Sequence, residues 1–462
     1  MLQQKLVERV LQAALSHGGD FAEIYVENKI EQHLSMVKEK IEKARSGQDF
    51  GIGIRIFNGV DYLYTYTNNE EENHLIEIAA LLSQAAKNRQ TVNRTITFKK
   101  ELIVPRHIAT IDPRVVSIER KRDVLSRVTR HAFDYHKSVS QVKASYFDET
   151  QRVLIANSDG LWAEDKRVRT RLFVEVIAAD QEQKQRGYLA PGASKGFEFY
   201  SEIDLRDIAE TAADSAVRML EARPCPGGKM PVVIDNGFGG VIFHEACGHG
   251  MEATAVAKGN GPYAGKLNQQ VVSEKISAID NGTIPNEWGS LHIDDEGTHT
   301  QRNSLIEKGI LKGYLIDKLG GRRLGMAPTG SARRQSYRFA PTSRMTNTYI
   351  LPGTDKLDDM IAGTEYGLYA KSMGGGSVNT TTGDFNFAVL EGYMIENGKL
   401  TYPVKGATLI GNGRQTMYDV DMVGNNFKPG QGMCGSISGS IPVNVGQPAL
   451  RVSQLTVGGS QS

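Results

Sequence analysis

The chain has 462 residues, a formal net charge of +1 at pH 7, 23% charged residues and 40% hydrophobic residues. These values are ordinary for a soluble globular protein and give no electrostatic basis for binding nucleic acid or a membrane. No apolar run approaches the roughly 18 residues of a membrane span, and the first residues lack the apolar core of a signal peptide. Three cysteines do not make a disulfide framework, so we expect a reducing, cytoplasmic location.

The length predicts two or three domains, and glycine usage separates them. Residues 1–226 contain 10 of the 49 glycines, and residues 227–462 contain the other 39. We expect an α+β protein with a helix and antiparallel-sheet domain over residues 1–95 and a helix and β-meander domain over residues 96–225. A glycine-rich, mostly β domain over residues 226–462 follows, and it carries the helix of the candidate metal site.

The first domain is predicted to begin with an amphipathic helix over Leu2–Ser16, which two glycines end. A second helix is expected from about Glu70 to Asn88, and a polar linker near Gln90–Lys100. Alternation of apolar and polar residues predicts the strands Phe21–Glu27, His33–Lys38, Gly51–Phe57 and Val60–Tyr66.

The second domain is predicted to contain a long charged helix from about Pro113 to Lys137 and a closing helix from about Asp204 to Arg218. Between them, alternation predicts the strands Gln141–Asp148, Gln151–Ala156 and Val168–Ala179. The charged residues of both helices are most simply explained as a helix face that is exposed to solvent.

The third domain contains the run His244-Glu245-Ala246-Cys247-Gly248-His249. Two imidazoles beside a carboxylate are the groups that hold zinc and activate water on it. The run follows a predicted strand, Met230–Ile234, and a turn, and it opens a helix-like stretch from Phe238 to about Lys258. The pattern indicates a zinc-dependent hydrolase that acts on peptide bonds.

The spacing departs from the usual metalloprotease pattern, in which the two histidines are four residues apart on one helix face. Here they are five apart, which separates them by about 140° on an ideal helix. Both histidines reach one metal only if the turn is distorted, and Gly248 and Gly250 ease such a distortion. The alternative is that both histidines are ordinary hydrogen-bonded core residues.

Cys434 lies in Gly432-Met433-Cys434-Gly435, which we expect to be a Gly/Ser-rich loop before a terminal strand at Ala449–Val457. A thiolate there completes a His-His-Cys set and leaves a fourth zinc position open, as catalytic sites require. The alternative is a small buried apolar residue, the commoner fate of a free cysteine. Cys247 is expected to pack inside the motif, and Cys225 to be inert.

Asp294-Asp295-Glu296-Gly297 has two interpretations, a second metal site or the turn chemistry of a bend between strands. We favour the turn, because Asp and Gly are typical turn residues.

Several motifs occur together in a fixed order along the C-terminal half. They are His244-Glu245-Ala246-Cys247-Gly248-His249-Gly250-Met251-Glu252, Asp294-Asp295-Glu296-Gly297, Arg344-Met345-Thr346-Asn347-Thr348-Tyr349, Thr382-Gly383-Asp384-Phe385, Lys405-Gly406-Ala407-Thr408-Leu409-Ile410-Gly411-Asn412-Gly413 and Gly432-Met433-Cys434-Gly435. The chain thereby resembles the TldD/PmbA family of zinc metalloproteases, sometimes labelled modulators of DNA gyrase. It is similar to the TldD-like members, which carry HExxxH, rather than to the PmbA-like (TldE) members, which lack it.

This resemblance implies one zinc ion per subunit, with His244, His249 and Cys434 as ligands and Glu245 as the catalytic carboxylate. It further implies a dimer, either of two identical chains or with a motif-less PmbA/TldE-like subunit. The subunits of this dimer would enclose a cavity that admits unfolded polypeptide and excludes folded domains. Cys247 departs from the small or aliphatic residue expected at its position. Glu252 and Asn347 are candidates for supporting contacts.

The expected mechanism uses zinc-bound water as the nucleophile, with Glu245 as general base and then as general acid toward the leaving amine. Two other classes stay open from the sequence. One is a non-catalytic, metal-stabilised peptide-binding or partner subunit, and the other is a hydrolase of a non-peptide amide or ester.

Overall fold

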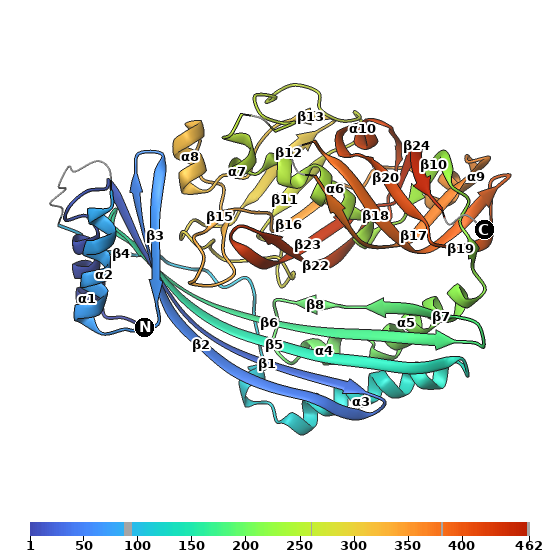
Figure 1. Cartoon of the computed structure of the whole chain (residues 1–462), viewed down its shortest axis with the longest axis horizontal. Coiled ribbons are helices and arrows are strands. Elements are labelled where there is room, and N and C mark those ends of the chain that lie inside the picture. Colours follow the sequence, from blue (N-terminus) through green and yellow to red (C-terminus); the bar gives the residue numbers. More distant parts are fainter. Residues whose placement is uncertain (87–94, 260, 380–381, 460–462) are drawn as a thin grey trace.

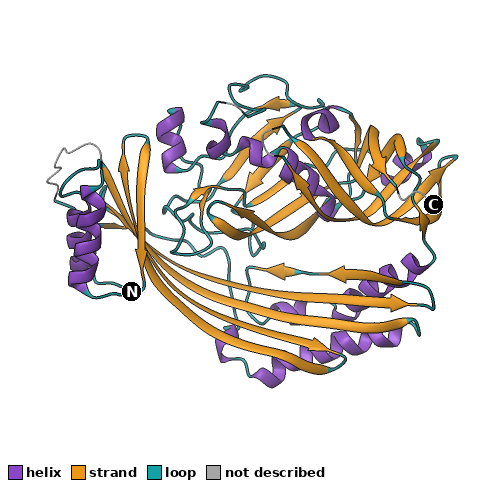
Figure 2. Ribbon diagram, in the orientation of Figure 1, coloured by secondary structure: helices purple, strands orange, loops and turns teal. Residues whose placement is uncertain are grey.

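The computed structural model describes residues 1–86, 95–259, 261–379 and 382–459. A strongly curved sheet of long strands forms one layer, and a β-rich C-terminal body lies on its concave side (Figure 1). Strands dominate both layers, and the longer helices lie on the outer side of the curved sheet (Figure 2). The α+β fold predicted from the sequence is confirmed. Within the described residues, no helix combines the length and the hydropathy needed to cross a membrane.

The curved sheet has the strand order β3-β2-β1-β5-β6-β4, and β7 and β8 also pair with β6. Its strands are β1 (Phe21–Val37), β2 (Lys40–Asn58), β3 (Asp61–Thr67), β4 (Lys99–Lys100), β5 (Val139–Asn157), β6 (Leu161–Ala179), β7 (Lys184–Leu189) and β8 (Gly192–Ala193). The accompanying helices are α1 (Gln4–Ala14), α2 (Glu72–Gln84), the 3-10 turn η1 (Pro113–Val115), α3 (Ile118–Tyr135), α4 (Phe199–Glu202) and α5 (Leu205–Leu220).

The long strands of this sheet correct the sequence prediction. Phe21–Glu27 and His33–Lys38 are parts of the single strand β1, and Gln141–Asp148 and Gln151–Ala156 are parts of β5. The prediction ended each run where polar residues interrupt the apolar alternation, yet the pairing of β1 with β5 continues through these residues without a shift in register. Their polar side chains lie between the two layers of the molecule rather than in loops.

Because β1 pairs with both β2 and β5, strands from residues 1–95 and from residues 96–225 belong to one sheet. The predicted helices correspond to α1, α2, α3 and α5; the first three are shorter than predicted, and α5 extends two residues further, to Leu220. The last residues of the predicted second helix, 87 and 88, and the linker residues 90–94 lie outside the described residues. Of the remaining linker, Lys99–Lys100 forms β4.

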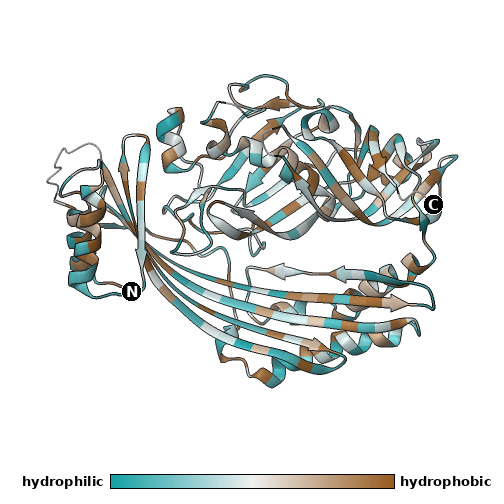
Figure 3. Cartoon of the chain, in the orientation of Figure 1, coloured by the Kyte–Doolittle hydropathy of each residue, from teal (hydrophilic) through white to brown (hydrophobic). Residues whose placement is uncertain are grey.

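The two faces of the curved sheet differ in polarity. Apolar and polar residues alternate along its strands (Figure 3). The apolar face packs against α1 and α2 at one end, through residues such as Ile24 and Ile54, and against α3 and α5 at the other, through residues such as Val174. The opposite face carries charged side chains and turns toward the C-terminal body.

Buried ion pairs join the two layers. Arg55 of β2 lies 3.1 Å from Glu23 and 2.5 Å from Glu296, and all three side chains are almost completely buried. Arg167 of β6 lies 2.6 Å from Asp295. Removing one partner of such a pair leaves an uncompensated buried charge, which typically costs about 3–5 kcal/mol. These contacts fix the position of the C-terminal body on the sheet.

The C-terminal body contains two larger sheets. In the first, the order is β17-β10-β24-β20-β18-β19-β9, and additional pairing of β17 with β18 closes part of it on itself. The second has the order β13-β12-β11-β16-β23-β22, so β22 is an edge strand among the described residues.

Its strands are β9 (Arg223–Pro224), β10 (Gly228–Ile234), β11 (Ala278–Asn281), β12 (Arg302–Glu307), β13 (Ile310–Leu311), β14 (Ala332–Arg333), β15 (Thr342–Ser343), β16 (Asn347–Ile350), β17 (Tyr366–Val378), β18 (Asp384–Glu396), β19 (Lys399–Lys405), β20 (Thr408–Asn412), β21 (Val420–Val423), β22 (Lys428–Ser436), β23 (Gly439–Gln447) and β24 (Leu450–Gly458). Its helices are η2 (Gly237–Gly240), α6 (Val241–Ala246), η3 (Gly248–Met251), α7 (Ala253–Val256), α8 (Lys318–Leu324), α9 (Leu357–Ala362) and α10 (Gly413–Tyr418). A large apolar core lies between α6 and these sheets.

Candidate metal centre

The histidine run does not form one continuous helix, so that prediction is wrong. Helix α6 ends at Ala246, and Cys247 adopts φ −121° and ψ −49° before the separate 3-10 turn η3 begins. Gly248 lies against Met345, and a Cβ atom there would be 2.3 Å from the Met345 sulfur. The expected distortion between the two histidines is therefore a break in the helix at Cys247, and a side chain at the next residue, Gly248, would crowd Met345.

This break lets the two histidines converge. Nε2 of His244 and Nε2 of His249 each lie 3.2 Å from Sγ of Cys434. The three donor atoms all lie within 4.8 Å of one another, and the two imidazole rings are nearly perpendicular, at 83°. The structure thus brings together the three side chains that the sequence singled out as metal ligands.

Cys434 reaches this position from the edge strand β22 rather than from a loop. The glycines around it suggested a loop, but β22 pairs with β23 along its whole length, and Cys434 is opposite Ile441. Its side chain is buried, and its carbonyl oxygen accepts a 2.5 Å hydrogen bond from the fully buried Arg344. A paired strand and a buried guanidinium therefore fix the position of the sulfur.

Two carboxylates flank His249. Glu245 Oε2 lies 3.7 Å from Nε2 of His249, on the same side as the sulfur, and its side chain is 29% exposed. Glu252 Oε2 lies 3.1 Å from Nδ1, the other ring nitrogen, so the carboxylate fixes the ring orientation. Arg344 Nε lies 3.9 Å from Glu252 and links this carboxylate to the strand of Cys434.

Asn347, the other residue proposed for a supporting contact, lies elsewhere. Its side chain hydrogen-bonds to Gly289, Asn281 and Ser290 within the loops of the C-terminal body. Arg344 donates to the carbonyl oxygen of Cys434 and lies 3.9 Å from Glu252, and sequence reasoning missed it as a supporting residue. Its only signal was its place beside Met345 in one of the motifs quoted above.

Burial sets the protonation of the site. It lowers the pKa of His244 well below its usual range, and the neighbouring His249 adds to this effect. Burial also acts against protonation of His249, but Glu252 and Cys434 outweigh it and raise the pKa of that imidazole. The pKa of Glu245 is raised by burial, and the charge of Glu252 contributes. A neutral His244 is the form that offers a lone pair to a metal.

The donor set fits a zinc ion. Zn²⁺ binds imidazole nitrogen at about 2.0–2.1 Å and thiolate sulfur at about 2.3 Å, so tetrahedral neighbours lie about 3.5 Å apart. The 3.2 Å separations between Cys434 Sγ and the two imidazole nitrogens match this spacing. Two nitrogens and one sulfur leave one tetrahedral position for a reactant.

The other cysteines lie outside this cluster. The Cys247 sulfur is buried 4.0 Å from the Gly413 carbonyl, and burial raises the pKa of its thiol to about 12. Burial raises the pKa of Cys225 to about 11. Both residues are free thiols that pack in the core.

The acidic run at residues 294–296 forms a turn, as favoured from the sequence. Asp294 Oδ1 accepts hydrogen bonds from the backbone N–H groups of Glu296 and Thr298, and Asp295 and Glu296 pair with arginines of the curved sheet. The three carboxylates of this run therefore already take part in hydrogen bonds or ion pairs within the protein.

Comparison with known proteins places the chain in a family. The model of the PmbA/TldA metallopeptidase C-terminal domain matches residues 227–459, the central-domain model matches residues 111–220, and the domain 1 model matches residues 22–89. The chain is 37% identical over 449 residues to the metalloprotease TldD homolog of Haemophilus influenzae, covering 96% of this chain and 93% of that protein. It is 35% identical over 455 residues to the metalloprotease TldD homolog of Buchnera aphidicola, with the same coverage.

Two solved structures share the fold. A Thermotoga maritima protein, described as a candidate modulator of a DNA gyrase, superposes with a TM-score of 0.79 at 22% identity, over 95% of this chain and 96% of that one. TldE from Thermococcus kodakarensis superposes with a TM-score of 0.78 at 18% identity, over 98% and 99% of the two chains. These matches extend over essentially the whole chain, and the chain belongs to the PmbA/TldD family of metallopeptidases.

Proposed function

We propose that this chain is a zinc-dependent peptidase that hydrolyses unfolded peptides or polypeptides. The observation that carries this proposal is the convergence of His244, His249 and Cys434, residues far apart in the chain, with the Glu245 carboxylate beside them. The metalloprotease relatives support a metallopeptidase role. The specific mechanism rests on the geometry of these four side chains.

In this proposal, His244, His249 and Cys434 would hold one zinc ion per chain. When bound there, zinc supplies a Lewis acid that polarises a carbonyl and makes water more acidic. Glu245 acts as the general base and then carries the proton to the leaving amine. Burial favours its protonated form, which suits a carboxyl group that must hold a proton between these two transfers.

Glu252 and Arg344 act as positioning residues. Glu252 accepts a hydrogen bond from His249 and keeps Nε2 directed at the sulfur of Cys434. Arg344 holds the backbone of Cys434 through its carbonyl oxygen. Such outer contacts fix the geometry of metal ligands before any substrate arrives.

A cleft beside His249 supports an extended substrate. It has a volume of about 370 Å³ and lies between η3, α8 and the tip of the β22–β23 hairpin. Tyr62 of β3 and Ile437 of the hairpin tip contribute to its lining, and Ile437 is 77% exposed. A cleft of this size fits a few side chains of an extended chain and excludes a folded domain.

The proposed assembly is a dimer, formed by two identical chains or with a motif-less PmbA/TldE-like subunit, in a reducing cytoplasm. The likeness to TldE supports a partner that shares this fold. The free state of Cys225, Cys247 and Cys434 fits a reducing compartment. In the alternative function, a non-catalytic metal-stabilised partner, the metal would only hold the fold together.

The experiment compares the wild-type chain with Glu245→Gln, alone and with a PmbA/TldE-like partner. Cleavage of an unfolded polypeptide is measured together with bound zinc, and a small acyl ester is tested beside it. We expect the variant to lose at least roughly 100-fold in cleavage rate while it keeps about one zinc per chain. Full activity of the variant would show that another group is the base. No cleavage by any wild-type preparation, together with unfolding by chelator, would favour the structural metal.

A further inference from the structure

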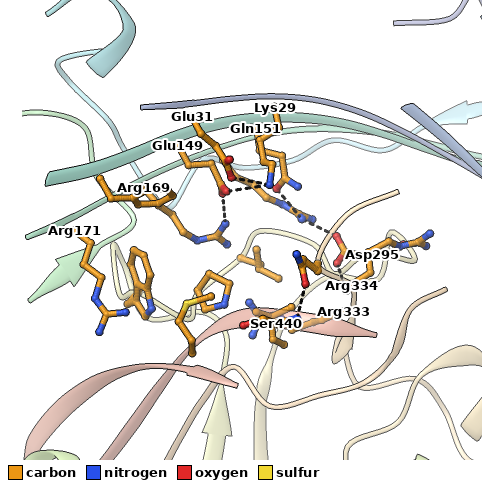
Figure 4. Close-up of a pocket in the computed structure, with 18 of the residues that line it drawn as sticks. Lys29, Glu31, Glu149, Gln151, Arg169, Arg171, Asp295, Arg333, Arg334 and Ser440 are labelled. Carbon is orange, nitrogen blue, oxygen red and sulfur yellow. Dashed lines mark hydrogen bonds and ion pairs between the residues drawn. The ribbon is translucent and has the colours of Figure 1, made fainter. Parts of the chain in front are cut away.

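A cavity of about 490 Å³ lies between the curved sheet and the β22–β23 hairpin, apart from the cleft beside His249. Figure 4 shows the side chains that extend into it from both layers. Three neighbouring strands contribute every second residue, so these side chains share the concave face of the sheet. They are Lys29, Glu31 and His33 from β1, Phe147, Glu149 and Gln151 from β5, and Arg167, Arg169 and Arg171 from β6.

These residues face one another in register. Glu31 is opposite Glu149, which is opposite Arg169. The loops and strands of the C-terminal body close the cavity from the other side with residues that include Arg333, Arg334 and Ile441. The cavity therefore has two walls held together by the ion pairs between the layers, and its size is typical of a ligand site.

The charges of this lining do not balance. Six cationic side chains line the cavity against three carboxylates. Each carboxylate is already paired: Glu31 lies 2.7 Å from Lys29, Glu149 lies 3.1 Å from Arg169, and Asp295 lies 2.6 Å from Arg167. Arg334 pairs with Glu23, which lies outside the lining, at 3.1 Å, so Arg171 and Arg333 are the two lining cations without a carboxylate partner among the described residues.

Two arginines of this lining form no ion pair with any carboxylate of the described residues. Arg333 is 2% exposed and donates to the carbonyl oxygen of Met345. Arg171 donates to two carbonyl oxygens and lies over the ring of Trp288, 5.2 Å from its centroid. A buried guanidinium without a counter-charge is costly unless an anion joins it.

The titration of these groups agrees with the geometry. Burial lowers the pKa of Arg333 to about 9, and the positive charge of Arg169 adds to the lowering. Burial also lowers the pKa of Arg171. Both directions describe cations that an incoming anion would stabilise.

Apolar side chains form the remainder of the lining. They are Phe147, Trp288, Leu291, Met433 and Pro442, and Trp288 lies next to Arg171. The indole N–H of Trp288 donates to the carbonyl oxygen of Gly432, which fixes the ring in the wall. A ligand that fills this space needs an apolar group as well as a charge.

We propose that this cavity binds an organic anion whose carboxylate or phosphate group lies between Arg169 and Arg333. The apolar part of the ligand packs against Trp288 and Met433. Guanidinium groups match both oxyanions because their N–H donors form a fork. The site goes beyond the proposed peptidase function, since its cationic groups take no part in the candidate metal centre.

The natural reporter of this site is Trp288, because the chain has only two tryptophans. Trp162 packs against Phe98 on the other face of the sheet, so Trp162→Phe leaves one indole that reports on the cavity. The zinc-loaded protein with this substitution is titrated with N-acetylphenylalanine, with its uncharged amide and with phenyl phosphate. The change in Trp288 emission is followed.

We expect saturable binding of at least one charged probe and at least 10-fold weaker binding of the amide. The tighter charged probe identifies the oxyanion. Arg333→Gln should weaken binding by about 10- to 100-fold, the usual loss for a hydrogen bond to a charged group. Arg206→Gln, which removes an exposed arginine of α5, is the matched control and should bind as the parent does.

Arg169→Gln removes the other arginine of the proposed anion site, and it provides a second test in case Arg333→Gln fails to fold, which circular dichroism would reveal. The proposal is overturned if neither charged probe gives a saturable change or if the amide binds as tightly as the acid. It is also overturned if folded Arg333→Gln or Arg169→Gln protein binds the charged probe with the parent's affinity.

Discussion

Cys434 Sγ lies 3.2 Å from Nε2 of His249, although 185 residues separate the two in the chain. His249 is in a 3-10 turn after a broken helix, and Cys434 is in the edge strand of a sheet. No local pattern links the two elements. Their contact with His244 is what makes this part of the molecule a candidate metal centre.

Cys434→Ser tests the contribution of the sulfur. A hydroxyl is a poorer zinc ligand than a thiolate, so zinc affinity should fall by more than the roughly 10- to 100-fold that loss of an outer contact costs. The measurement is competition for zinc with a chromophoric chelator. Cys247→Ala removes the buried sulfur that lies outside the cluster, and it should keep the wild-type affinity. Equal affinities of the two variants would exclude Cys434 as a ligand.

Glu252→Ala tests the support of His249. Without the carboxylate at Nδ1, the imidazole loses its fixed orientation, and zinc affinity should fall by about 10- to 100-fold. Glu252→Gln keeps an oxygen acceptor and should lose less. The measurement is the zinc dissociation constant of the wild type, Glu252→Gln and Glu252→Ala, which should increase in that order. Glu307→Ala, in β12, is a surface control and should bind zinc as the wild type does. An alanine variant that binds zinc as tightly as the wild type would remove Glu252 from the site.

Gly248→Ala tests the break in the helix. The added Cβ would lie 2.3 Å from the Met345 sulfur, so the free energy of unfolding should fall by about 1–3 kcal/mol, as for other overpacked cores. Urea denaturation measures this loss. Gly375→Ala is the control, because no atom lies within 4 Å of its added Cβ.

The same substitution in a Met345→Ala background separates crowding from backbone strain. If crowding against Met345 is the cause, Gly248→Ala should cost clearly less there than in the wild type. An unchanged cost would place the cause in the backbone of η3 instead.

His107 predicts a pH dependence of stability. Its Nδ1 accepts a 3.0 Å hydrogen bond from the N–H group of Asn286, which requires the neutral ring. Burial lowers the pKa of His107 to about 4 from an ordinary value of 6.5, and the neighbouring His292 contributes. The unfolded chain therefore binds an additional proton between pH 6.5 and 4, so stability is present above pH 6.5 and is lost as the pH falls.

Urea midpoints measured from pH 7 to pH 4 should show this loss, which amounts to at most about 3 kcal/mol. His107→Asn retains an acceptor for Asn286 but does not titrate, and its profile should be flatter over the same range. Parallel profiles of the wild type and the variant would show that other groups cause the acid sensitivity.

Much of the fold class follows from local patterns. The helices α1, α3 and α5 have apolar faces at helical spacing, and they form within a few residues of their predicted bounds. The long strands were broken in two by the prediction, because Glu27–Gln32 is polar at nearly every position. In the fold, side chains such as Lys29 and Glu31 face a cavity between two layers, and no local pattern reveals such a partner.

The candidate site was predictable in part. The spacing of His244 and His249 required a distortion, and the structure has one, but as a break at Cys247 rather than within a continuous helix. The assignment of Cys434 as a ligand rested mainly on the family resemblance. The glycines around it suggested a loop, but the residue lies in strand β22. Arg333, which lines the separate cavity, gave no signal, because a single arginine in a sequence does not reveal what surrounds it after folding.

The position of β22 near the end of the chain has a consequence for biogenesis. During translation both imidazoles emerge from the ribosome almost two hundred residues before the thiol does, so the trio cannot assemble until the final hairpin has been made and has docked. If the chain is the peptidase proposed above, this order is protective, because the nascent polypeptide carries no complete zinc-binding trio while the segments between His249 and Cys434 are still being made.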